Sequence, residues 1–156
     1  MHPTLRVIMS IRSLSLIVAA SSVFAAFLSP VSASAETLHF SAQLSSATEV
    51  PPHQTDGTGM VKATYNTTSK ALHYDITYKG LTGPATAAHF HGPAMEGQNA
   101  PPVVPIKPTD LASPIKGEAT LTAAQAADLT AGKWYFNVHT AANPGGEIRG
   151  QLAAAK

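Results

Sequence analysis

Short stretches of alternating apolar and polar residues dominate the chain after about residue 36, and turn-forming residues separate them. A period of two is typical of strands that bury one face. In Leu72 to Tyr78, for example, Leu72, Tyr74, Ile76 and Tyr78 share one face, whereas His73, Asp75 and Thr77 lie on the other. The pattern predicts eight strands: Leu38 to Leu44, Gly59 to Tyr65, Leu72 to Tyr78, Thr86 to His91, Val103 to Ile106, Ile115 to Leu121, Trp134 to His139 and Glu147 to Leu152.

One segment departs from this pattern and predicts a short helix. Thr122 to Gln125 has the sequence of a capping box, and Gly132 is placed to end the helix. Many short strands with one helical insert favour an all-β fold, a two-layer antiparallel β-sandwich with Greek-key connections. A closed β-barrel is the alternative.

The first 35 residues read as a secretory signal peptide rather than as part of the fold. Arg6 and Arg12 precede an apolar stretch from Leu14 to Leu28, and Ala33-Ser34-Ala35 has the small residues of a cleavage site. The apolar stretch is short for a membrane span, and a retained N-terminal anchor is the alternative. We therefore expect export to the periplasm or the cell exterior, and a single domain over residues 36–156 without a membrane span.

Charge and cysteine content narrow the possible partners. Without Arg6 and Arg12, eight of the ten Lys and Arg residues remain against nine Asp and Glu. No row of basic residues is left to neutralise phosphates, so we do not expect the protein to bind nucleic acid. The chain has no cysteine, so any metal site would be built from imidazole and oxygen donors.

Three histidines form a candidate metal site. His89 and His91 flank Phe90 in one predicted strand, so both imidazoles lie on one face and Phe90 on the other. His139 lies on the polar face of another strand, with Tyr135 and Asn137. A His-x-His pair and a third histidine on a rigid sheet can give three nitrogen ligands. Ordinary surface histidines are the alternative interpretation of the same pattern.

Further residues have open roles around this site. His53 or His73 could supply a fourth nitrogen, although each fits a solvated position. Glu147 could orient a histidine or pair with Arg149. Arg149, the only arginine after residue 35, could attract a small anion to the metal or could pack its stem and bind loop carbonyls.

Several sequence blocks together resemble the chordin-domain (CHRD) family: Glu49 to Pro52, Gly80 to Pro84, Ala87 to Pro93, Asn137 to Thr140 and Asn143 to Leu152. The resemblance extends from about Leu38 to Leu152 and implies an extracytoplasmic β domain. It indicates the fold class more than the function.

A looser resemblance concerns the copper site of copper/zinc superoxide dismutase. His89 to Gly92 and Val138-His139 are similar to its copper-ligand segments, and the Pro-Gly-Gly turn before Arg149 is similar to the turn before its anion-steering arginine. No segment clearly supplies a bridging histidine or the zinc loop, and the order and spacing of the blocks differ.

Three functions are consistent with these features. The first is a copper enzyme that disproportionates superoxide at His89, His91 and His139, with Arg149 guiding the anion. The second is a non-catalytic carrier of copper, or alternatively of zinc. The third is a structural or adhesion domain in which the proline-rich loop from Gly92 to Pro108 binds a protein partner.

Overall fold

The computed structural model describes residues 34–155 of the chain. The predicted signal peptide, residues 1–35, lies outside the described residues except for its last two and stays a prediction. None of the helices in the described part is long and apolar enough to cross a membrane.

The described chain is all-β with one α-helix, as the alternating pattern predicts. The strands are β1 (Thr37–Ser45), β2 (Thr58–Asn66), β3 (Ala71–Lys79), β4 (Ala85–His91), β5 (Pro102–Pro105), β6 (Ile115–Thr120), β7 (Tyr135–Thr140), β8 (Ile148–Gln151) and β9 (Ala153–Ala154). The helix is α1 (Ala123–Thr130), and two short 3-10 turns lie at Ser46–Thr48 and Pro108–Asp110. The sequence pattern did not predict the 3-10 turns or a separate β9.

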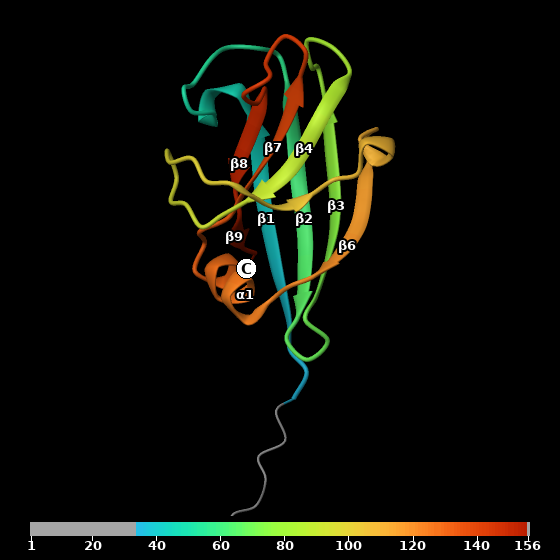
Figure 1. Ribbon diagram of the computed structural model, residues 1–156, viewed down its shortest axis with the longest axis vertical. Coiled ribbons are helices and arrows are strands. Elements are labelled where there is room, and N and C mark those ends of the chain that lie inside the picture. Colours follow the sequence, from blue (N-terminus) through green and yellow to red (C-terminus); the bar gives the residue numbers. More distant parts are fainter. Residues whose placement is uncertain (1–33, 156) are drawn as a thin grey trace, which may run out of the picture. The chain divides into compact units, whose positions relative to one another are not determined.

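The strands form two layers that continue into each other. Their hydrogen-bonded order is β5-β4-β7-β8-β1-β2-β3-β6, and β9 also pairs with β1. Figure 1 shows β4, β7 and β8 lying across β1, β2 and β3. A single residue pair, Ser45 with Arg149, joins β8 to β1, so the sheet folds over at this point. The result is an antiparallel sheet nearly closed into a barrel, and both sandwich and barrel describe it.

The core lies between the two layers, and its contacts show which side chains of each strand point inward. Phe90 on β4 and Phe136 on β7 are direct cross-strand partners, and their ring centroids are 4.8 Å apart. Phe90 is fully buried and also contacts Tyr74 of β3, which belongs to the other layer, at 5.3 Å between centroids. Because successive side chains alternate in direction, His89 and His91 must point away from this core.

The helix begins at the predicted capping box. The Thr122 hydroxyl accepts a hydrogen bond from Gln125 N, and Thr122 N donates to Gln125 Oε1. Both bonds satisfy backbone N–H groups that would otherwise be unpaired at the start of the helix. Leu129 anchors the helix in the core and is fully buried.

Candidate metal site

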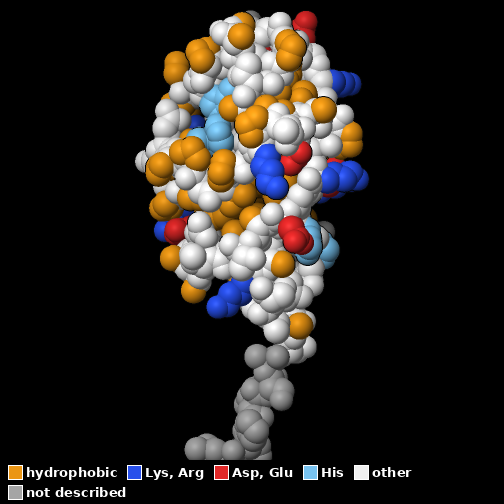
Figure 2. All heavy atoms as spheres, turned by 45° about the vertical axis from the view of Figure 1, so that its right-hand side comes forward, with side chains coloured by type: hydrophobic (Ala, Val, Ile, Leu, Met, Phe, Trp, Pro, Cys, Tyr) orange, Lys and Arg blue, Asp and Glu red, His pale blue; other side chains and the backbone are white. Residues whose placement is uncertain are grey.

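The pairing of β4 with β7 brings the three predicted histidines together on the outer face of one layer. The register places His89 opposite Asn137, His91 opposite Tyr135, and Ala87 opposite His139. All these side chains have the same parity and therefore point outward. Figure 2 shows one group of histidine side chains in the upper part of the view, with hydrophobic side chains around it, and a second group lower down beside acidic side chains.

The three imidazoles are close enough to share one ion. One ring nitrogen of each of His89, His91 and His139 lies within 4.8 Å of the others. His89 Nδ1 and His139 Nε2 are 3.2 Å apart. His91 is 7% exposed, whereas the other two are half-buried. The cluster is therefore partly enclosed by protein and open to solvent on the side of His89 and His139.

Backbone carbonyls of two loops determine which nitrogens of His91 and His139 face the centre. His91 Nδ1 lies 2.8 Å from Ala100 O, in the proline-rich loop, and His139 Nδ1 lies 3.0 Å from Pro144 O, in the Pro-Gly-Gly turn. A carbonyl oxygen only accepts hydrogen bonds, so each Nδ1 carries the proton. Each Nε2 then keeps its lone pair and faces the cluster, which is the arrangement of a metal-ligating histidine with an outer carbonyl partner.

The surroundings keep two of the imidazoles neutral. Burial lowers the pKa of His89 to about 4, and the neighbouring His139 and His91 contribute to the shift. Burial also lowers the pKa of His91, although its hydrogen bonds to Ala100 and Asn137 oppose the shift. Neutral imidazoles are the form that binds a metal ion.

Arg149 lies beside the cluster but is engaged by protein groups. It is 2% exposed, and its guanidinium carbon lies 3.4 Å from the centroid of the Tyr135 ring. It donates hydrogen bonds to Asn99 Oδ1 and Gln98 O, at 2.9 and 2.5 Å. Tyr135 in turn stacks on His91, with 4.7 Å between centroids and 4° between planes. These contacts correspond to the packing alternative for Arg149, and its role in attracting an anion stays a prediction.

Glu147 makes neither of the contacts expected for it. It is fully buried, and its carboxylate accepts hydrogen bonds from Thr82 N, from the Thr82 and Thr140 hydroxyls, and from Asn143 Nδ2, rather than from a described histidine or Arg149. The strand begins at Ile148, after Glu147, so the outward parity expected from the strand does not apply to this residue. Glu147 fixes the turn that carries Pro144.

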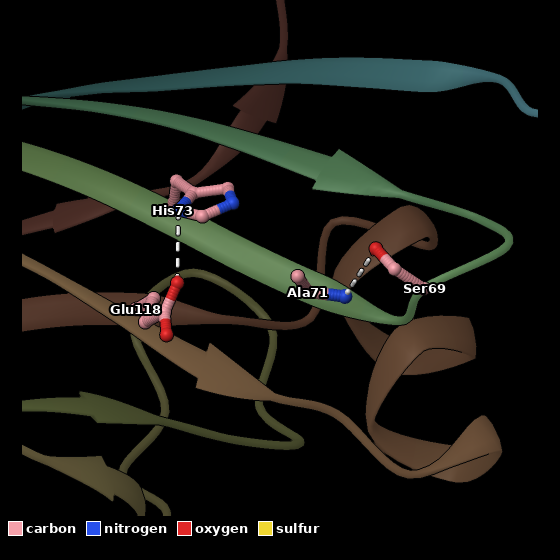
Figure 3. Close-up of polar contacts among 4 residues, drawn as sticks. All are labelled: Ser69, Ala71, His73 and Glu118. Atoms are coloured by element: carbon pink, nitrogen blue, oxygen red, sulfur yellow. Dashed lines mark hydrogen bonds and ion pairs between the residues drawn. The ribbon is translucent and has the colours of Figure 1, made fainter.

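Neither candidate for a fourth nitrogen belongs to the cluster. His73 lies on β3, in the other layer, where Nδ1 is 3.5 Å from Glu118 Oε2 and both side chains are mostly exposed (Figure 3). His53 lines a cavity of about 220 Å³ beside Glu49 and the turn from Asn143 to Gly146. His53 Nε2 is buried and has no hydrogen-bond partner among the described residues.

Two buried polar residues that the sequence did not identify complete the site. Asn137 is 3% exposed, and its Oδ1 lies 3.0 Å from both His91 Nε2 and His139 Nε2. Asn137 Nδ2 donates a long hydrogen bond of 3.5 Å to Glu49 Oε1. Glu49 is 5% exposed, and burial raises its pKa against the opposing effects of Val50 N and Arg149. Strand parity places Asn137 on the histidine face, but no local pattern brings Glu49 to it.

Comparisons with known proteins identify the family. Neither the curated proteins nor the solved structures that were compared contain a match to this chain. Residues 40–152 match the family model described as CHRD domain, a region that contains both strands of the histidine cluster, Glu49 and the Pro-Gly-Gly turn. The chain therefore belongs to the CHRD domain family, as the sequence blocks predict.

Proposed function

We propose that the protein is an exported domain that binds one copper ion through His89, His91 and His139. The observation that carries the proposal is the convergence of ring nitrogens within 4.8 Å, with the outer nitrogens of His91 and His139 donating to carbonyl oxygens. Three ring nitrogens gathered this closely on rigid strands suit a cation, because a metal ion binds the lone pairs of several neutral imidazoles at once.

The donor set favours copper among the common divalent ions. Imidazole suits copper and zinc, and Cu(II) binds such donors more tightly than the other first-row divalent ions. The chain offers no thiolate. Zinc is the alternative ion, because three imidazoles and an open position also fit its preferred geometry.

Binding without catalysis is the role that the geometry supports best. The half-buried His89 and His139 leave the ion accessible from solvent, which suits exchange with a carrier or a small ligand. Arg149, the residue expected to guide superoxide, donates its described hydrogen bonds to Asn99 and Gln98 and is almost fully buried. Superoxide disproportionation is therefore the second candidate, supported by the open side of the cluster.

A metal titration tests the binding proposal. The protein is titrated with Cu(II) and, in parallel, with Zn(II), in competition with a chelator of known affinity. We expect one tight Cu(II) equivalent that His89→Ala or His139→Ala abolishes. His73→Ala is the matched control, because His73 lies in the other layer beside Glu118, and it should bind as the unaltered protein does. Equal binding by a His89→Ala/His139→Ala double variant would contradict the proposal.

The copper-loaded protein then decides between the two roles. Rapid superoxide decay that Arg149→Ala slows, with a weaker dependence on salt and with copper still bound, would support an enzyme. Tight binding without decay would support a carrier.

Export is tested separately. Fractionation of the producing cells, with mass spectrometry of the recovered protein, should find a chain that begins at Glu36 outside the cytoplasm. A full-length cytoplasmic chain would contradict export.

A further inference from the structure

Asn137 occupies the centre of the histidine face. It lies directly opposite His89 of β4 on one side and Arg149 of β8 on the other, and it is two residues from His139 on its own strand. A cross-strand partner and a same-face neighbour are the closest side chains on a sheet surface. Asn137 therefore lies next to cluster histidines of both β4 and β7.

The distances around Asn137 are those between neighbouring ligands of one ion. Two ligand atoms at about 2.0–2.1 Å from a shared ion lie about 2.9 Å apart at a right angle and about 3.4 Å apart in a tetrahedron. Asn137 Oδ1 lies 3.0 Å from His91 Nε2 and 3.0 Å from His139 Nε2. The two histidine nitrogens His89 Nδ1 and His139 Nε2 are separated by 3.2 Å.

The contact between Asn137 and His91 lacks a proton when the imidazole is neutral. His91 Nδ1 donates to Ala100 O, so its Nε2 has only a lone pair to offer, and an amide oxygen is likewise only an acceptor. His139 Nε2, in contrast, can accept a hydrogen bond from His89 Nδ1. A cation placed between His91 Nε2 and Asn137 Oδ1 would satisfy both acceptors.

Glu49 determines which end of the Asn137 amide faces the histidines. Asn137 Nδ2 faces Glu49 Oε1 at 3.5 Å, and turning the amide would bring its oxygen against the carboxylate instead. Gly146 makes room for this pair, because a Cβ there would overlap Glu49 Oε1 and would lie 2.8 Å from Asn137 Nδ2. Glu49 and the Pro-Gly-Gly turn thus meet at Asn137.

We propose that the Asn137 side-chain oxygen is the fourth ligand of the metal ion and that the buried Glu49 carboxylate is a positioning residue that holds this oxygen toward the histidines. The inference rests on the proposed metal binding and completes its donor set as three nitrogens and one oxygen. A neutral amide oxygen is a hard donor, which favours Cu(II) over the softer Cu(I).

Cu(II) and Cu(I) affinities of Asn137 variants test the fourth ligand. Asn137→Ala should weaken Cu(II) binding by at least about 10–100-fold, because the loss of a group that only supports a metal ligand already has an effect of this size. It should weaken Cu(I) binding much less and should change the Cu(II) electron paramagnetic resonance spectrum. Equal losses for both ions would indicate displaced histidines and would overturn the proposal, as would an unchanged affinity and spectrum. Absence of binding by the unaltered protein would refute the proposed function itself.

Glu49 variants test the positioning role. Glu49→Gln keeps an acceptor oxygen for Asn137 Nδ2 and should retain Cu(II) affinity within about threefold, whereas Glu49→Ala should reproduce the loss seen with Asn137→Ala. If Asn137→Ala does not fold by circular dichroism, the Asn137→Asp/Glu49→Gln double variant replaces it. That pair keeps an oxygen ligand and reverses the hydrogen bond, and we expect it to bind Cu(II) tightly. Weak binding by the folded double variant, or unaltered binding by Glu49→Ala, would overturn the proposal.

Discussion

Replacement of Glu147 by glutamine should destabilise the protein by about 2–4 kcal/mol at neutral pH. The fully buried carboxylate accepts four hydrogen bonds: from Thr82 N at 2.8 Å, from the Thr82 and Thr140 hydroxyls at 2.6 Å each, and from Asn143 Nδ2 at 3.2 Å. Hydrogen bonds to a charged group contribute about 1.5–3 kcal/mol each, against about 1 kcal/mol for neutral pairs. The Thr82 and Thr140 hydroxyls can rotate and accept hydrogen bonds from the amide NH₂ group of the new glutamine. Asn143 Nδ2, which is itself a donor, would then face that NH₂ group without an acceptor.

The effect of Glu147→Gln should also depend on pH. Burial opposes ionisation of Glu147, but the hydrogen bonds from Thr140, Thr82 and Asn143 outweigh it and lower its pKa below the usual 4.5. The charge therefore contributes its full stability above about pH 4.5, and this stability disappears as the pH falls through the folded-state pKa. Urea unfolding of both proteins at pH 7 and near pH 3 measures the difference, which should be smaller at the lower pH.

Glu118→Gln is the matched control for this substitution. Glu118 is largely exposed and contacts His73 (Figure 3), so its replacement should change stability by less than about 0.5 kcal/mol. A Glu147→Gln protein that is as stable as this control at pH 7, or that shows the same loss at both pH values, would refute the reasoning.

Three further predictions concern the core and the histidine face. In the metal-free protein, His89 should stay neutral until the pH approaches 4, because burial and the neighbouring His139 and His91 lower its pKa; a nuclear magnetic resonance titration with a midpoint near 6.5 would contradict this. Gly146→Ala should reduce stability and Cu(II) affinity, because the φ of Gly146 is +129° and a Cβ there would overlap Glu49. Gly145→Ala is the control, because a Cβ at Gly145 meets no atom within 4 Å and should change neither property. Thermal unfolding measures the stability and chelator competition the Cu(II) affinity, and equal effects of the two substitutions would disprove the close contact of Gly146 with Glu49. Phe90→Ala should lower the free energy of unfolding by about 3–5 kcal/mol, measured by urea unfolding, because the Phe90 ring is fully buried against Phe136 and Tyr74. A decrease below about 1 kcal/mol would show that the two layers do not pack against this ring.

Local patterns predicted the strands and the direction of the histidines. Alternation alone places His89 and His91 on one face and Phe90 on the other, and it places Asn137 beside His139. The capping box predicted the start of α1 because both of its hydrogen bonds form within four residues. These features are local, so the sequence contains them directly.

Contacts between distant segments could not be predicted in the same way. The register of β4 with β7 joins residues about 50 positions apart, and Glu49 reaches Asn137 from 88 positions away. Parity was also misleading for Glu147, which precedes β8 and turns inward to Thr140 and Thr82. The close contact of Gly146 with Glu49 depends on the turn conformation, which the Pro-Gly-Gly sequence permits but does not specify.

A crystal structure of the copper-loaded protein, with anomalous scattering measured at the copper edge, tests the central claim most directly. We expect one strong peak at about 2.0–2.2 Å from His89 Nδ1, His91 Nε2 and His139 Nε2. A peak at His73 and Glu118 instead, or no peak after loading with one equivalent, would contradict the assignment of this face as a metal site.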